Sequence, residues 1–284
     1  MKKRQKRKEN KKHSVFSIIG LGFKKWWQNF VIVVPFIFNA LAFVIGALIL
    51  LLIFSSLFVT LFHASLPLKA LQELMIAGAA GQTTLSPEII SALTNLLVPS
   101  TIIYFIFVGI ISVLILGLIK AYFYSGAIAM AKDLFINKKT DLKVMNKAGK
   151  KFLWRYWLVG LVIILGILIW LFIFSLPLLI TQNISLLAIP ILSLIPLIFV
   201  FVLFALADYF IVLENLSVLE SIKRSIFVVK KSYWSMFGLG LLFLLMSSIV
   251  GMIPWVGSLV SLLVIIPIQT IAFVLFALER SYRR

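Results

Sequence analysis

The sequence lacks cysteine and is poor in the side chains on which most active sites depend, with two histidines and nine acidic residues among 284. Without cysteine the chain forms no disulfide, thiolate metal site or cysteine nucleophile. His13 and His63 lie on either side of the first long apolar run, so a metal site shared between them is not expected. The HExxH, GxSxG and P-loop patterns do not occur in the sequence. We therefore expect no catalytic residue, cofactor or metal, and a lipid-modifying enzyme is the least favoured class of function.

Apolar residues are what the chain has in excess. They make up 62% of the sequence, and the mean hydropathy is +1.14, whereas about half of a soluble domain is apolar. A helix of about 20 apolar residues crosses the hydrocarbon core of a bilayer. The sequence therefore predicts an all-α, polytopic integral membrane protein with six spans, at about 31–62, 100–131, 156–180, 186–207, 234–253 and 257–278.

The charged residues are mainly basic, which gives a net charge of +18. If the six predicted spans are threaded through a membrane, 26 of the 27 lysines and arginines fall on one side. This asymmetry is the positive-inside pattern, so it predicts a protein of the cell membrane with both termini in the cytoplasm. It also explains the positive charge without a nucleic-acid partner. Residues 1–12 are predicted to form a disordered basic tail, and residues 13–284 a single six-helix membrane domain.

A short amphipathic stretch with a lysine pair and a tryptophan occurs three times, and two spans follow each copy. The copies begin at Ser14, at Asp141 and at Ser217, where Glu220 completes a capping box. All three start on the same side of the membrane. The pattern therefore predicts three parallel two-span repeats, each preceded by an amphipathic helix on the cytoplasmic face. An alignment of two copies pairs Asp133 with Asp208.

The basic and aromatic residues of these stretches are predicted to contact anionic lipid headgroups. Lysine and arginine attract such headgroups, and tryptophan is most stable at the headgroup level. The candidate contacts are Lys24, Lys25, Trp26, Lys150, Lys151, Trp154, Lys223, Arg224, Lys230, Lys231 and Trp234. The acids Asp208 and Glu214 border the fourth span, and we expect Lys223 and Arg224 to balance their charge.

Lys120 is the candidate functional residue inside the membrane. If the second span ends near Asp133, Lys120 lies 13 residues earlier, about 20 Å from that end at about 1.5 Å per residue. An ionisable group at that depth is costly and marks a functional site. If the span instead ends near Ala121, the Lys120 ammonium reaches the headgroups along its own alkyl chain. Both readings are compatible with the sequence.

Two parts of the chain carry a recurring pattern: Ser125-Gly126-Ala127-Ile128-Ala129-Met130 with Thr140-Asp141, and Ser221-Ile222-Lys223-Arg224-Ser225 with Val228-Val229-Lys230, Trp234, Phe237-Gly238 and Ile253-Pro254. This pattern resembles one that occurs in a family of uncharacterised prokaryotic six-span membrane proteins and in the membrane domain of some glycerophosphodiester phosphodiesterases. The resemblance covers most of residues 14–284, and its motif is moderately specific. The resemblance implies a six-span fold. The soluble phosphodiesterase domain is absent from this sequence, so the resemblance implies no catalytic residues.

Two functions remain after these exclusions. The first is a non-enzymatic membrane protein that interacts with lipid, organises the membrane or serves as an accessory subunit, with anionic headgroups of the cytoplasmic leaflet as its partners. The alternative is a transporter or channel for a small solute or lipid. A polar pathway is hard to build from one lysine and a few amides, which favours the first function. The sequence does not indicate protein partners.

Overall fold

Helices form all the regular structure of the computed structural model, which describes residues 13–62, 99–181 and 184–281; no strand occurs within these ranges. Six helical segments are long and apolar enough to cross a membrane. The prediction of an all-α protein with six apolar spans is therefore confirmed. The chain divides into two compact units, one formed by residues 1–40 and 120–284 and the other by residues 41–119. The predicted tail at residues 1–12 lies outside the described residues.

The smaller unit contains most of α3 (Val34–Phe62) and the first half of α6 (Pro99–Ile136). The two helices meet where a Cβ atom added at Gly46 would lie 3.0 Å from the Ile119 side chain. The Tyr104 hydroxyl donates a hydrogen bond to the carbonyl oxygen of Phe54, and its ring lies 5.5 Å from that of Phe58. This unit is therefore a packed helical hairpin.

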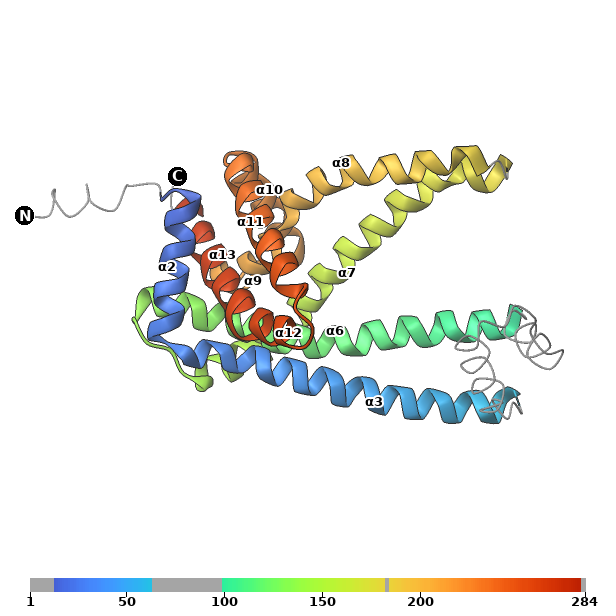
Figure 1. Ribbon diagram of the computed structural model, residues 1–284, viewed down its shortest axis with the longest axis horizontal. Coiled ribbons are helices and arrows are strands. Elements are labelled where there is room, and N and C mark those ends of the chain that lie inside the picture. Colours follow the sequence, from blue (N-terminus) through green and yellow to red (C-terminus); the bar gives the residue numbers. More distant parts are fainter. Residues whose placement is uncertain (1–12, 63–98, 182–183, 282–284) are drawn as a thin grey trace, which may run out of the picture. The chain divides into compact units, whose positions relative to one another are not determined.

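In the larger unit, α7 (Leu142–Thr181) contains both an amphipathic helix and a membrane span that were predicted as separate elements. The amphipathic stretch that follows Asp141 and the third span form one continuous helix. A 3₁₀ turn, η2 (Ile184–Leu187), leads into α8 (Ala188–Phe204), which runs back beside α7 (Figure 1). The Trp170 Nε1–H donates a hydrogen bond to the Ser193 carbonyl oxygen at 3.2 Å, which joins the two helices within the third and fourth spans.

The fourth span does not end in a simple helix terminus. After a break at residues 205–206, the chain forms α9 (Ala207–Glu214) and then α10 (Val218–Lys230). The fully buried Ser225 satisfies the backbone at the break, since its hydroxyl donates to the Leu203 carbonyl at 2.7 Å and accepts from the Leu206 N–H at 3.2 Å. One side chain of α10 thus replaces the hydrogen bonds that the helix loses there.

The last two spans are α11 (Tyr233–Gly251) and a segment with three parts: α12 (Val256–Val260), a π-helical turn at Ser261–Ile265 and α13 (Ile266–Ser281). At the π turn, the carbonyl oxygen of Leu263 accepts a hydrogen bond from the Trp26 indole N–H at 3.0 Å. Trp26 belongs to α2 (Val15–Gln28), which is followed by the 3₁₀ turn η1 (Phe30–Val33) and packs along α13. A Cβ atom added at Gly22 would lie 3.3 Å from Ile268, so this glycine allows a close helix contact.

A second close helix contact joins α6 to the start of α7. A Cβ atom added at Gly126 would lie 2.6 Å from Met145 Cγ, and one at Gly149 would lie 2.9 Å from both the ring and the carbonyl oxygen of Tyr122. The Tyr122 hydroxyl also donates to the Asn146 side chain at 2.8 Å. Glycine is required at both positions because the two backbones nearly touch.

The sequence signals for helix starts are present in the structure. The Ser14 hydroxyl accepts from the Ser17 N–H at 3.3 Å, and Asp141 Oδ1 accepts from the Val144 N–H at 3.0 Å. Ser217 and Glu220 form the predicted capping box, in which the Ser217 N–H donates to Glu220 Oε2 at 3.0 Å. The carboxylate of Glu220 accepts from the Ser217 hydroxyl and N–H, so its pKa lies below the ordinary value.

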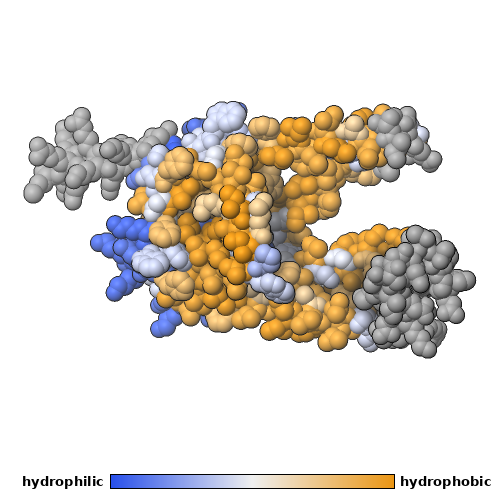
Figure 2. Space-filling model, viewed as in Figure 1, coloured by the Kyte–Doolittle hydropathy of each residue, from blue (hydrophilic) through white to orange (hydrophobic). Residues whose placement is uncertain are grey.

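The outward faces of the long helices are apolar. Many large aliphatic and aromatic side chains are exposed along α3, α6, α7, α8 and α11. In contrast, the buried residues of the larger unit concentrate in 127–134, 206–213 and 268–277. Apolar surface of this extent suits lipid rather than water. In Figure 2 the hydrophilic residues of this unit gather on the side where Figure 1 places α2 and the turn between α6 and α7. We call this side the basic end.

Candidate functional site: a basic pocket

A cavity of about 440 Å³ lies at the basic end, between the last turns of α6, the first turns of α7 and the end of α9. Its volume is in the range of sites for small ligands. We call it the basic pocket, and its lining residues are Ala129, Lys132, Asp133, Ile136, Val144, Lys147, Ala148, Lys151, Phe152, Val212, Leu213, Glu214 and Asn215. Most of these side chains are apolar, and the polar ones include three lysines.

Two local features of the sequence build the walls of the pocket. The glycine contacts described above bring α6 and α7 together, and the Asp141 cap starts α7 directly after the turn. Lys147 and Lys151 are four residues apart, so they lie one above the other on the same face of the helix. Asn215 adopts a left-handed conformation with φ 55°, which ends α9 at the edge of the pocket.

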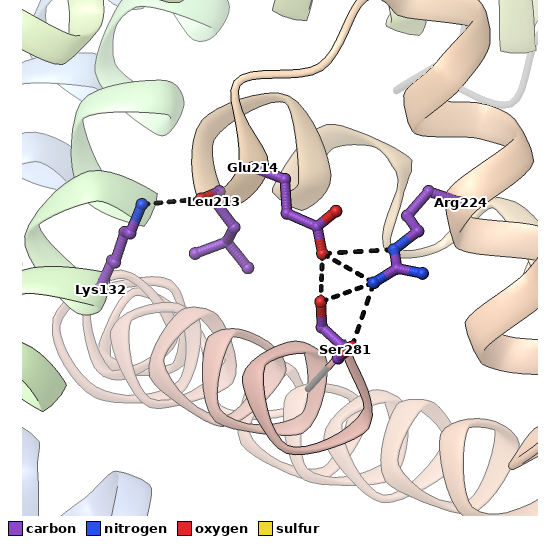
Figure 3. A network of polar contacts seen from close by, with 5 residues as sticks. All are labelled: Lys132, Leu213, Glu214, Arg224 and Ser281. Carbon is purple, nitrogen blue, oxygen red and sulfur yellow. Dashed lines mark hydrogen bonds and ion pairs between the residues drawn. The ribbon is translucent and has the colours of Figure 1, made fainter. Parts of the chain in front are cut away.

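Lys132 lies where α6 and α9 meet. Its Nζ donates a hydrogen bond to the Leu213 carbonyl oxygen at 2.7 Å (Figure 3). This oxygen belongs to the last turn of α9, where carbonyl groups lack helical partners and carry partial negative charge. The positive charge of Lys151 and the negative charge of Glu214 also act on Lys132, in opposite senses.

Both carboxylates of the pocket already have partners. Glu214 pairs with Arg224 at 3.2 Å, and the Ser281 hydroxyl also donates to it. Figure 3 shows the Glu214 carboxylate turned away from Lys132 and bonded to Arg224 and Ser281. Arg224 donates to the carbonyl oxygen of Ser281 at 3.1 Å and to its hydroxyl at 3.0 Å. Asp133 Oδ1 accepts a hydrogen bond from the Asn137 amide at 2.5 Å.

The pocket lysines on α7 have no such partner. Within the described residues the ion pairs are His13 with Glu279 and Arg224 with Glu214. Lys147 and Lys151 are both exposed and belong to neither pair. The Lys151 ammonium rests over the ring of Phe152, 4.9 Å from its centroid. Three lysines and two carboxylates thus line the basic pocket, and no ion pair joins Lys147 or Lys151 to a carboxylate among the described residues.

A second polar cluster lies in the larger unit, where residues of α6, α7 and α9 come together. Asp208 on α9 has one carboxylate oxygen, Oδ1, that is buried without a hydrogen-bond partner. The hydroxyl of the buried Tyr156 and the charge of Lys120 both act on the Asp208 carboxyl. Lys120 itself is exposed, with its ammonium 5.4 Å from the centroid of the Tyr124 ring. The cluster joins residues of α6, α7 and α9.

This arrangement corrects the expected charge balance in one of its two parts. Arg224 pairs with Glu214, as predicted. Asp208 is influenced by Lys120, a residue of the second span, rather than by Lys223 or Arg224. The reason is the helix break at residues 205–206, after which α9 packs against α7 and places the half-buried Asp208 near Tyr156.

The candidate headgroup contacts fall into three groups in the structure. Lys25 and Arg224 form hydrogen bonds within the protein. Lys25 Nζ donates to the Leu134 carbonyl oxygen at 3.1 Å, and Arg224 donates to the carbonyl oxygen of Ser281. Trp26 is only 6% exposed and hydrogen-bonded inside the protein, whereas its neighbour Trp27 is 71% exposed. Trp26 is thus a packing residue, and Trp27 has the exposure expected of an interfacial ring. The exposed candidates are Lys24, Lys150, Lys151, Trp154, Lys223, Lys230, Lys231 and Trp234.

Lys132 and Lys147 were not among the site residues predicted from the sequence. Lys147 precedes the predicted site residue Lys151 by one helical turn, and this spacing indicates that the two lysines share a helix face. The role of Lys132 depends on the position of α9, which the sequence does not indicate. Among the described residues, no group of three or more histidine, aspartate or glutamate side chains is placed to hold a metal.

Comparison of the chain with protein-family models, curated proteins and solved structures found no match. The resemblance to the membrane domain of glycerophosphodiester phosphodiesterases therefore remains a prediction from the sequence.

Proposed function

We propose that this chain is a non-enzymatic integral membrane protein that binds anionic lipid headgroups at its basic end. The observation that carries the proposal is the basic pocket, which Lys147 and Lys151 line together with Lys132 and where no described carboxylate forms an ion pair with these lysines. Exposed lysines and tryptophans outside the pocket extend the cationic and aromatic surface. Lipid is the favoured partner because the surrounding helices expose apolar side chains along their length.

The orientation that goes with this function places the basic end in the cytoplasm of the cell. The distribution of 26 of the 27 basic residues supports it, because positive loops are retained on the cytoplasmic side. The cytoplasmic leaflet also carries the anionic lipids that a basic end attracts. Both termini are on that side in this arrangement.

We also propose the threefold repeat as the origin of this surface. Eight residues after each capping residue stands a small residue at a close helix contact: Gly22 after Ser14, Gly149 after Asp141 and Ser225 after Ser217. The caps of the second and third copies are 76 residues apart. At that spacing Ala131 aligns with Ala207, which is equally buried, and Asp133 aligns with Tyr209. This register differs by one residue from the predicted pairing of Asp133 with Asp208.

The test uses the full-length protein in nanodiscs that contain equal amounts of phosphatidylglycerol and phosphatidylcholine. Native mass spectrometry then counts the lipids that remain bound after the disc is removed. We expect phosphatidylglycerol to be retained in preference to phosphatidylcholine, and this preference to weaken in about 0.5 M salt because screening reduces attraction between exposed charges. Equal retention of the two lipids would refute the proposed function.

A transport function is the second candidate, and the cluster of Lys120, Asp208 and Tyr156 is the observation that favours it. Ionisable residues inside a membrane domain often mark ion or proton pathways. Proton and Rb⁺ flux into proteoliposomes tests this candidate. Flux that exceeds that of empty liposomes, disappears in Asp208→Asn and persists in the surface variant Lys150→Ala would favour transport over lipid binding.

A further inference from the structure

The basic pocket has the properties of a site for one particular ligand as well as those of a general cationic surface. Lys132 approaches from α6, and Lys147 and Lys151 approach from one face of α7. Two charges act on Lys132, and the positive charge of Lys151 has a larger effect than the negative charge of Glu214. Ammonium groups that repel each other around a cavity are stabilised when an anion lies between them. The cavity therefore favours a ligand with negative charge.

The acidic side chains of the pocket form no ion pair with its lysines among the described residues. Glu214 is turned toward Arg224 and Ser281 (Figure 3). Asp133 accepts a hydrogen bond from Asn137, beside the turn that leaves α6. Neither carboxylate lies within 4.0 Å of a pocket lysine among the described residues. An anion that enters the pocket thus replaces no existing ion pair.

The walls indicate that the ligand has an apolar part. Ile136, Val144, Phe152 and Val212 line the same cavity as the three lysines. A free inorganic anion gains no stabilisation from apolar side chains. A phospholipid presents a phosphate next to a glycerol backbone and acyl chains, which can pack against them. The helices that form the pocket continue into membrane-length apolar segments, so acyl chains have an apolar surface to follow.

We propose that the basic pocket binds one anionic phospholipid, with its phosphate held by Lys132, Lys147 and Lys151 and its glycerol region against the apolar walls. This inference rests on the proposed function and makes it specific, because it assigns one lipid to one site. The remaining lysines of the basic end form a diffuse surface that attracts headgroups without selecting a single molecule.

The test compares two double variants of the full-length protein that lose the same charge. In K147Q/K151Q both substitutions lie in the pocket, whereas in K139Q/K143Q both exposed lysines are close in sequence but do not line it. Each purified protein is titrated in a neutral detergent with dioctanoyl phosphatidylglycerol, and with dioctanoyl phosphatidylcholine as the zwitterionic control. Native mass spectrometry reports the affinity of the first bound lipid. A third titration, with glycerol phosphate, supplies the phosphate without acyl chains.

We expect wild type to bind phosphatidylglycerol more tightly than phosphatidylcholine and to show no binding of glycerol phosphate at the same concentrations. Two basic contacts at about 1 kcal/mol each correspond to about 30-fold in affinity, so K147Q/K151Q should bind phosphatidylglycerol about 30-fold more weakly. The control K139Q/K143Q should change by less than about threefold. The variant K147R/K151R keeps the charge and should retain most of the affinity, which separates loss of charge from loss of fold.

The other outcomes distinguish failure of this inference from failure of the proposed function. If both charge-reducing variants weaken binding equally, or neither does, the pocket is not the site, although the basic end still binds anionic lipid. Binding of glycerol phosphate as tight as that of the lipid would assign the pocket to a soluble phosphate ester instead. If wild type does not distinguish phosphatidylglycerol from phosphatidylcholine, the proposed function itself is wrong.

Discussion

Replacing Gly149 by alanine should weaken the contact between α6 and α7 on which the basic pocket depends. The added Cβ would lie 2.9 Å from the Tyr122 ring and 2.9 Å from the Tyr122 carbonyl oxygen. The ring can turn aside, but the carbonyl belongs to the backbone of α6, so the two helices must separate. Overpacking of this kind costs about 1–3 kcal/mol. Alanine also favours the helix by about 1 kcal/mol relative to glycine, which offsets part of that cost.

The matched control is Gly160→Ala, on the same helix, where an added Cβ would have nothing within 4 Å. This variant keeps the gain in helix propensity and avoids the clash, so the two variants should differ by about 1–3 kcal/mol. For a chain of this size, that difference corresponds to roughly 5 °C in Tm. Tryptophan fluorescence during heating in detergent measures both. Equal Tm values for Gly149→Ala and Gly160→Ala would refute the close crossing of α6 and α7.

Three further variants test other contacts of the larger unit. Ser225→Ala leaves the buried Leu206 N–H without its acceptor and should lower the free energy of unfolding by about 1–3 kcal/mol, whereas Ser248→Ala, at an exposed position, should change it little. A double-mutant cycle of Glu214→Gln and Arg224→Gln should give a coupling of about 1 kcal/mol in the same thermal assay, because the two charges bond directly, and strict additivity would contradict the pairing. The lowered pKa of Glu220 means that its ionised form stabilises the fold above the unfolded pKa, near 4.5, and that this contribution disappears as the pH falls through the folded pKa. Wild type should thus lose stability relative to Glu220→Gln only in that acidic range, and a difference between the two that does not change from pH 7 to pH 3 would show that the ionised carboxylate contributes nothing.

The sequence is a good guide to features that depend on neighbouring residues. The six apolar spans follow from hydropathy alone, and the helix starts at Ser14, Asp141 and Ser217 follow from local capping chemistry. The pairing of Arg224 with Glu214 is also of this kind, since both residues border the same short link between helices. Hydropathy and capping act within a few residues, so these features can be predicted from sequence.

Features that depend on distant helices were not accessible to the same reasoning. The indole of Trp26 resembles an interfacial anchor in sequence, yet it is buried because a π turn more than 200 residues later presents a free carbonyl. Asp208 resembles a border residue, but the break before α9 turns it toward Tyr156 and Lys120. Gly22 disfavours a helix when the sequence is considered alone, because glycine has a low helix propensity. In the structure it lies in α2, where the lack of a side chain allows close contact with Ile268.

The basic pocket illustrates the same division. Lys151 could be selected from its lysine pair, and Lys147 from its spacing to Lys151 on one helix face. Lys132 joins them only because α9 ends beside α6 and offers the Leu213 carbonyl as a hydrogen-bond acceptor. The positive charge of the site can therefore be predicted from the sequence. The shape of the pocket, and the absence of an ion pair between its lysines and its carboxylates among the described residues, depend on how the helices pack.

The most direct test of anionic-lipid binding at the basic end is photo-crosslinking with a phosphatidylglycerol that carries a diazirine in its headgroup. The full-length protein is reconstituted with this lipid, irradiated and digested, and mass spectrometry identifies the modified residues. The account predicts that modification concentrates in residues 129–136, 144–152 and 212–215, the segments that contain the lining residues of the basic pocket. Modification spread evenly along the chain, or concentrated in residues 41–62 and 99–119 of the smaller unit, would contradict it.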